Sequence, residues 1–173
     1  EEVISYYLKK FRNKEVAIEL TERTDRKGHG KLKFLDYWFE NDQSERISLI
    51  RSGMDCQMAL KLVNTTKEEV KNVRVSVGID DDQARRITIF SNDLTNQSIS
   101  LAAEETKIIK IVVPVFPLQA GVYHFTLFSS ENEVVSDWIM NAGSFEVEHG
   151  DFFKTGRIIQ VNQGNILVNH EFI

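Results

Sequence analysis

Residues 56–63 read Cys-Gln-Met-Ala-Leu-Lys-Leu-Val, and residues 73–79 read Val-Arg-Val-Ser-Val-Gly-Ile. In both stretches a large apolar residue or the cysteine occupies every second position, which is the period of a β-strand with one buried face. The first stretch ends at Asn64-Thr65-Thr66 and the second at Asp80-Asp81-Asp82, and both endings are rich in turn-forming residues. The two stretches therefore predict strands, with Cys56 on the core side of the first.

The chain immediately before them predicts another strand with an irregularity. Leu32 and Phe34 share one face, and Tyr37 and Phe39 share one face, but the two pairs are out of phase. A β-bulge at residues 35–36 restores the phase. Trp38 then points away from the core.

Strand-length runs continue after residue 80. Ile87 and Ile89 begin one strand, residues 122–128 form another after Gly121, and short apolar runs lie at 134–135 and 145–147. The nearly continuous apolar run 108–115 predicts a central strand or one covered on both faces, although Pro114 and Pro117 indicate that it ends at an edge. About eight strands without a helical crossover favour antiparallel pairing. The predicted fold is all-β, an immunoglobulin-like or jelly-roll antiparallel β-sandwich with a short N-terminal helix.

Composition supports this fold class. Val, Ile and Thr number 41 against 19 for Ala plus Leu, and β-branched residues favour strands. The formal net charge of -5 provides no basic excess for a phosphate backbone, so we expect no nucleic-acid partner. No apolar stretch is long enough for a membrane helix and no signal-peptide pattern opens the sequence. One cysteine excludes an internal disulfide.

The two ends of the chain carry different predictions. Residues 1–12 have apolar side chains at helical spacing, so residues 1–27 are expected to be a linker helix and a connection from an upstream domain. Residues 28–173 are expected to form the sandwich. Within them, residues 158–161 and 166–168 predict a hairpin through the turn at 162–165. Its exposed apolar side chains favour a homodimer formed by strands in residues 156–173.

Motifs for catalysis are absent from the sequence. There is no phosphate-binding loop, nucleophile elbow, HExxH motif or dinucleotide fingerprint. The four histidines are scattered, and Asp80-Asp81-Asp82 lacks the spacing of an EF-hand loop. We expect no enzyme activity, no cofactor and no metal. A carboxylate pair for glycoside hydrolysis comes together only in space, so a hydrolase stays open as an alternative.

Binding is the function class that a β-sandwich without catalytic motifs favours. Aromatic side chains on an outward strand face stack on sugar rings, and amide, imidazole and guanidinium groups hydrogen-bond hydroxyls. Trp138 is interpreted as a core residue more readily than as a stacking platform. The predicted carbohydrate-binding set contains the outward-facing positions Trp38, Gln57, Lys61, Arg86, Thr88 and His124.

Four stretches in order resemble a known family. They are Leu-Gln-Ala-Gly-Val-Tyr at 118–123, Ser-Asp-Trp at 136–138 with Phe-Glu-Val at 145–147, and Leu-Val-Asn-His-Glu-Phe at 167–172. This combination is similar to the C-terminal domain of Wzt proteins, the nucleotide-binding subunits of ABC transporters that export O-antigen polysaccharide. The resemblance runs from about Gly28 to the last residue. The family often has Trp where this chain has Phe172.

The resemblance implies a fold, partners and a location. It implies an immunoglobulin-like sandwich that exchanges C-terminal strands in a dimer and binds the non-reducing end of the O-antigen glycan, which carries a chemical cap in some members. The upstream region is then an ATPase domain, and the membrane subunits of the transporter are partners at the cytoplasmic face of the bacterial inner membrane. The alternative within this resemblance is a dimerisation and docking platform that binds no glycan.

Overall fold

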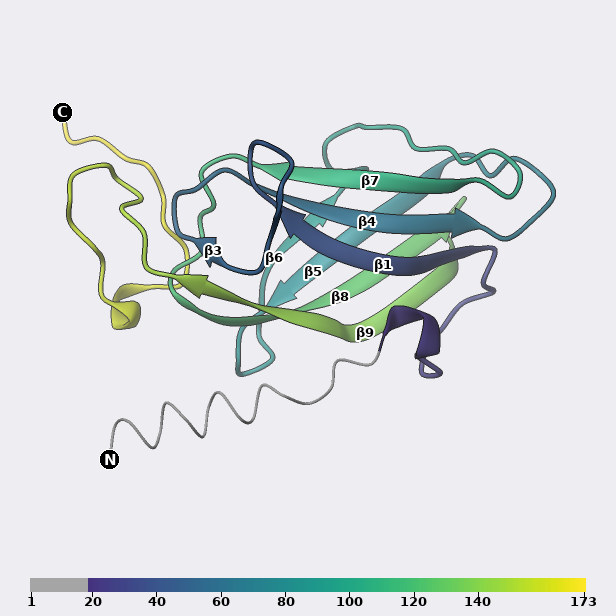
Figure 1. The fold of residues 1–173 in the computed structure, drawn as a ribbon, viewed down its shortest axis with the longest axis horizontal. Helices are drawn as coiled ribbons and strands as arrows, with labels where there is room; N and C mark the ends of the chain where they lie inside the picture. The colour runs from purple at the N-terminus through teal and green to yellow at the C-terminus, as the bar shows by residue number, and fades with distance from the viewer. Residues whose placement is uncertain (1–18) are drawn as a thin grey trace.

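The computed structural model describes residues 19–173 (Figure 1). The helix predicted over residues 1–12 lies outside the described residues. Two short 3₁₀ helices occur in the described part, η1 at Leu20–Glu22 and η2 at Val161–Gln163. All other regular elements there are strands, which confirms the all-β class.

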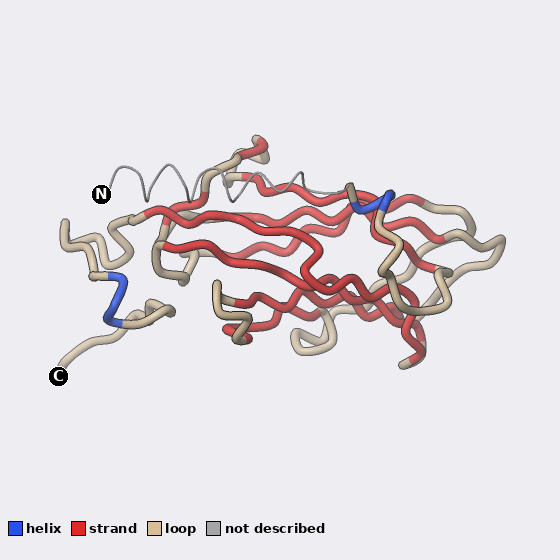
Figure 2. The backbone as a smooth tube through the Cα atoms, turned by 90° about the horizontal axis from the view of Figure 1, so that it is seen from below, coloured by secondary structure: helices blue, strands red, loops and turns tan. Residues whose placement is uncertain are grey.

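Two sheets form the two layers of the sandwich (Figure 2). The four-stranded sheet has the order β2-β1-β4-β7 and the five-stranded sheet the order β3-β9-β8-β5-β6. Every pairing between neighbouring strands is antiparallel except β3 with β9, which is parallel. The strands are β1 Leu32–Glu40, β2 Arg46–Ile47, β3 Ile50–Arg51, β4 Cys56–Asn64, β5 Val73–Asp80, β6 Arg86–Ser91, β7 Thr106–Val113, β8 Gly121–Glu131 and β9 Val134–Glu148.

The core lies between the sheets and is built by strand alternation. Every second side chain of β4, β5 and β8 is buried, as the sequence predicts. Phe145 of β9 joins the layers, because its ring stacks on Tyr123 at 5.7 Å between centroids and packs on Phe39 of the other sheet at 5.1 Å. The inward set is Cys56, Met58, Leu60, Leu62, Val73, Val75, Val77, Ile79, Tyr123, Phe125 and Leu127.

The predicted bulge in β1 is confirmed. The register between β1 and β4 shifts between Phe34 and Asp36. After the shift, Tyr37 faces the core and packs edge-on against Phe125, with 4.7 Å between ring centroids. Trp38 therefore points to the outer face of the four-stranded sheet.

The expectation that the run 108–115 is covered on both faces is wrong. Among the strands of residues 19–173, β7 pairs only with β4, so it is an edge strand there, in keeping with the prolines that follow it. Its exposure alternates along the strand, and Ile108 and Val112 are 52% and 63% exposed. Nothing within residues 19–173 covers this outer face, so an apolar run here does not report burial.

The hairpin predicted near the C-terminus does not form within the single chain. Residues 161–163 are a 3₁₀ helix, and residues 156–173 contain no strand. The segment attaches to the loop before β8 instead: Leu118 forms an isolated bridge with Ile166, and the Leu167 N–H donates to the Pro117 carbonyl at 2.7 Å. The two apolar pieces thus have no partner strand here, and their role in a dimer stays a prediction.

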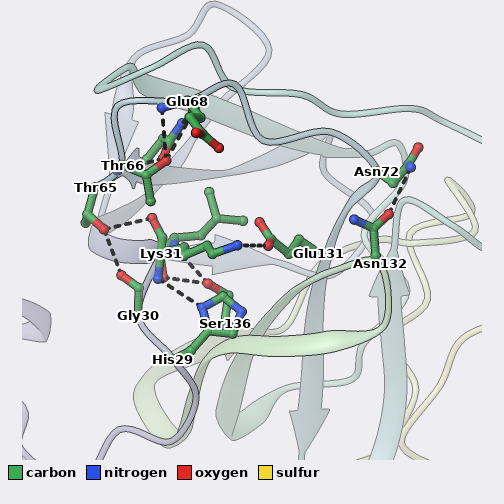
Figure 3. Close-up of polar contacts among 12 residues, drawn as sticks. His29, Gly30, Lys31, Thr65, Thr66, Glu68, Asn72, Glu131, Asn132 and Ser136 are labelled. Carbon is green, nitrogen blue, oxygen red and sulfur yellow. Dashed lines mark hydrogen bonds and ion pairs between the residues drawn. The ribbon is translucent and has the colours of Figure 1, made fainter.

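The segment before β1 is attached to the end of the sandwich and to β9. Thr65 Oγ1 donates to the carbonyls of Gly30 and Lys31, and Lys31 forms an ion pair with Glu131 (Figure 3). Lys27 pairs with Trp138 of β9 through both backbone groups. Gly28 has φ +114°, and a Cβ there would lie 3.0 Å from the Asp137 nitrogen and closer still to the Ser136 carbonyl. Only glycine allows this approach.

A buried charge pair holds the same segment to β1 and β9. Asp137 is 2% exposed and accepts a hydrogen bond from the Phe34 N–H at 2.8 Å. The Arg26 guanidinium lies 3.2 Å from the carboxylate and also donates to the Phe34 carbonyl. Burial raises the pKa of Asp137, and the Phe34 hydrogen bond and Arg26 oppose this effect. The carboxylate therefore depends on its two partners to stay ionised.

Replacing Asp137 by Ala is predicted to lower the free energy of unfolding by about 3–5 kcal/mol, because it leaves Arg26 buried without its counter-ion. Asp137→Asn keeps an acceptor for the Phe34 N–H and should cost less. Urea unfolding at pH 7 measures both. Equal stability of the Ala variant and the wild type would contradict this role.

The raised pKa of Asp137 also predicts a pH trend. The folded state binds the proton of this carboxyl more tightly than the unfolded state does. The contribution of Asp137 to stability is therefore largest below the ordinary carboxyl pKa, and it falls as the pH rises through the raised pKa of the folded state. The unfolding free energy of Asp137→Asn relative to wild type should therefore increase between about pH 3 and pH 7. A relative stability that decreases over this range would show that the pKa is not raised.

Candidate functional site

Strand alternation places small residues at the centre of the outer face of the five-stranded sheet. On β5 and β8 the large side chains face the core, which leaves Ser76, Gly78 and Thr126 on the other face. Gly78 pairs with Thr126 on one side and with Ile89 on the other. Cross-strand partners share a face. The middle of this face is therefore lower than its surroundings.

Larger side chains surround this floor and make a groove of about 240 Å³. Aromatic and aliphatic groups stand on β6, β8 and β9, and an arginine stands near each end of β5's exposed face. We call this site the outer groove. It is lined by Arg74, Ser76, Gly78, Arg86, Ile89, Thr126, Phe128, Trp138 and Met140.

Trp138 is the main aromatic group of the outer groove. It pairs across the strands with Phe128, and the two rings are edge to face at 6.3 Å between centroids. The Lys27 ammonium lies 5.2 Å from the Trp138 ring centroid. The indole N–H donates to no acceptor within residues 19–173, so it is available to a ligand.

Both arginines of the outer groove are paired with carboxylates. Arg86 contacts Asp80 through Nε at 2.6 Å and through Nη2 at 3.4 Å. Arg74 Nε lies 3.2 Å from Asp93, and its guanidinium lies over the Phe128 ring at 5.6 Å. The outer groove thus offers donors and apolar surface without a large excess of charge.

The six residues that the sequence predicts for carbohydrate binding do not share one face in the structure, and the prediction that Thr88 faces outward beside Arg86 is wrong. Arg86 lines the outer groove, and His124 pairs with Asp80 next to it. Thr88 pairs with the core residue Ile79, because a bulge between Ile79 and Asp80 puts it out of phase with Arg86. The remaining three, Trp38, Gln57 and Lys61, belong to β1 and β4 of the other sheet.

Trp38 is engaged by its own neighbours. Its Nε1–H donates to Glu40 at 2.6 Å, and the Arg46 guanidinium lies over its ring at 4.2 Å from the centroid. Lys110 also donates to Glu40, and these two hydrogen bonds, that of Lys110 first, lower the pKa of the buried Glu40 carboxyl. The exposed parts of the Trp38 side chain therefore offer less to a ligand than Trp138 does.

A further cavity of about 340 Å³ opens between the edges of β6 and β7. Phe90, Ile99, Ile109 and Ile111 line it together with loop residues after β6. It is lined by a single aromatic side chain, Phe90, with hydrogen-bonding groups from loop residues, whereas two aromatic side chains, Phe128 and Trp138, line the outer groove. The outer groove is therefore the better candidate for a polar ligand that also has apolar surface.

A match to the model of a protein family shows to which family the chain belongs. The model of the Wzt C-terminal domain matches residues 23–159. The chain belongs to the Wzt C-terminal domain family. Membership in this non-catalytic domain family supports its assignment as a C-terminal domain of an ABC transporter component. No curated protein matches the chain.

One solved structure supports the fold of this Wzt C-terminal domain. The crystal structure of the C-terminal domain of Wzt aligns with a TM-score of 0.70 and 16% identity, covering 87% of this chain and 89% of that one. At this identity the match shows the fold alone. The CARDB domain of the PF1109 protein from Pyrococcus furiosus aligns at a TM-score of 0.39 and 16% identity, covering 66% and 88%. A family 2 β-glucuronidase aligns at 0.41 and 9%, covering 64% and 10%. These two are too distant to inform function.

Residues 19–173 hold no group of three or more His, Cys, Asp or Glu side chains placed to bind a metal ion. Among the same residues, no helix has the length and hydrophobicity to cross a bilayer.

Cys56 is predicted to be unreactive in the folded domain. The side chain is 2% exposed, and burial raises the pKa of the thiol to about 12. Because the thiolate is the reactive form, a disulfide reagent at pH 8 should label Cys56 only after urea unfolding. The chain has one cysteine, so the absorbance reports this site alone. Rapid labelling of the folded protein would contradict the predicted burial.

Proposed function

We propose that this domain binds the non-reducing end of O-antigen polysaccharide in the outer groove and so selects the glycan for export. The observation that supports the proposal is an aromatic ring, Trp138, beside a floor of hydroxyl groups and a glycine. A sugar ring has an apolar face and a rim of hydroxyls, and such a groove offers a partner to each. The family assignment to an ABC transporter is consistent with this substrate.

The chemistry of binding follows from the lining residues. The apolar face of a sugar packs on Trp138, with Phe128 and Met140 extending the contact. The Thr126 hydroxyl and the Arg86 guanidinium line the groove and can hydrogen-bond the sugar hydroxyls. Ser76 is 2% exposed and its Oγ is hydrogen-bonded to Ser91 Oγ at 2.6 Å, so it belongs to the floor and is not counted among the ligand-binding groups. A ligand that leaves one of these groups buried and unpaired loses about 1–3 kcal/mol, which gives discrimination between chain ends.

A shallow site of this size binds weakly, and a dimer would compensate. Once one glycan end is bound in the first site of a dimer, a second glycan end on the same polymer or membrane surface is held close to the second site. Its effective concentration there is raised, which increases the overall affinity of the dimer. We propose that the C-terminal segment 156–173 forms the dimer contact. Its apolar side chains Ile158, Val161, Val168 and Phe172 are each more than half exposed in the single chain.

The same exposed segment favours a second candidate function. In it, the domain is a dimerisation and docking platform for the transporter and binds no glycan. Both candidates place the domain at the cytoplasmic face of the inner membrane with the membrane subunits as partners. Only the first requires the outer groove.

Replacing Trp138 by Ala tests the glycan site. The probe is O-polysaccharide purified from the strain that encodes the protein, titrated into the domain in a calorimeter. Loss of the stacking surface should weaken binding about tenfold or more, which is 1.4 kcal/mol or more. Trp38→Ala is the matched control on the other sheet and should bind as the wild type does.

Three results would reject glycan binding in the outer groove. They are absence of binding by the wild type, equal affinity of the Trp138 variant, or selective loss in the Trp38 variant. The first would support the docking platform. Circular dichroism of both variants shows whether the sandwich is intact.

A further inference from the structure

Arg86 occupies the space that a side chain at position 78 would fill. A Cβ built on Gly78 would lie 2.8 Å from Arg86 Nη2 and closer still to Cζ and Nη1. Real Cβ atoms do not approach so closely, so the guanidinium rests on the backbone of β5. Gly78 does not have a positive φ, so the backbone conformation does not require glycine at this position. The close contact with Arg86 explains the absence of a side chain.

Asp80 holds the guanidinium in this position. Arg86 uses Nε and Nη2 for the carboxylate, at 2.6 and 3.4 Å. Nη1 donates to no acceptor within the part of the chain that the structure describes. Because Gly78 is at the floor of the outer groove, the unused Nη1 donors lie at that floor.

Of the two other charged side chains around the outer groove, one is paired with a carboxylate and one lies over an aromatic ring. Arg74 is paired with Asp93, and Lys27 lies over the Trp138 ring. The remaining lining side chains are uncharged. An anionic ligand would have to displace the Asp80 carboxylate from Arg86 or approach it closely. A hydroxyl oxygen accepts from Nη1 while the ion pair stays intact.

We propose that Arg86, seated on Gly78 and held by Asp80, is the specificity-determining donor of the outer groove, and that the groove selects an uncharged sugar residue. This inference rests on the proposed glycan binding. Arg86 acts through one hydrogen bond to a neutral hydroxyl, and its charge is balanced before the ligand arrives. Gly78 is a positioning residue, since it reserves the space for the guanidinium.

Substitution at Gly78 tests the positioning. Gly78→Ala displaces the flexible guanidinium without overlapping backbone, so the domain is expected to fold. Binding of the purified O-polysaccharide should weaken about tenfold, the loss of one hydrogen bond to a charged donor. Gly121→Ala is the matched control in the same sheet, because a Cβ there makes only ordinary contacts with Tyr123 at 3.7 Å or more. It should leave the affinity unchanged.

Salt dependence tests the charge of the ligand without knowledge of its identity. Between 20 and 500 mM NaCl the dissociation constant of the wild type should change less than about twofold, since ionic screening acts little on a neutral contact. Asp80→Asn frees the guanidinium and should weaken binding by loss of its orientation.

The outcomes separate this inference from the proposed function. No binding by the wild type rejects the proposed function, and this inference with it. Binding that is lost in Trp138→Ala but weakens more than about fivefold with salt, or strengthens in Asp80→Asn, supports the glycan site and overturns the neutral ligand. Equal affinities of the Gly78 and Gly121 variants overturn the role of Arg86.

Discussion

The packing of large side chains from β5 and β8 into the core determines which side chains form the outer face of the five-stranded sheet. Val77 and Phe125 face inward, and strand geometry then forces their neighbours Gly78 and Thr126 outward. The same alternation that buries the core therefore sets the depth and chemistry of the outer face. A one-residue change of register in β5 would put apolar side chains into the groove and Gly78 into the core, and the same change in β8 would put Thr126 there.

The positions of β4, β5 and β8 could be predicted from the sequence, because alternation over five or more residues has a single interpretation. The bulge in β1 could be predicted because two apolar pairs, at 32 and 34 and at 37 and 39, are out of phase. The site could be predicted only in part. Bulges in β5–β6 pairing and in β8–β9 pairing change which side chains share a face, so Thr88 separates from Arg86 and Trp138 joins Phe128. No residue pattern in the sequence of β9 marks the bulge in the middle of this strand.

Sheet membership is the second property that the sequence leaves open. Trp38 and His124 are both outward, yet they lie on different layers of the sandwich. Alternation within a strand shows which of its side chains face outward. It does not show which other strands lie beside it in the sheet. The C-terminal segment fails for a related reason, since residues 158–168 have strand-forming side chains but find a partner only in one bridge to the loop before β8.

Strand β9 connects the candidate site to the segment that precedes the sandwich. Trp138 forms one wall of the outer groove and pairs through its backbone with Lys27. Arg23 donates to the carbonyls of Met140 and Asn141, two and three residues further along β9. The segment before β1 is thus part of the surroundings of the groove, and the buried pair of Arg26 with Asp137 fixes it there.

The central claim is that saccharide binds on the outer face of the five-stranded sheet. Amide and indole chemical shifts of the isotope-labelled domain, recorded during titration with the purified O-polysaccharide, test it most directly. The account predicts the largest changes at the Gly78 and Thr126 amides and at the Trp138 indole N–H. Changes confined to Trp38, Gln57 and Lys61, or none at saturating polysaccharide, would contradict it.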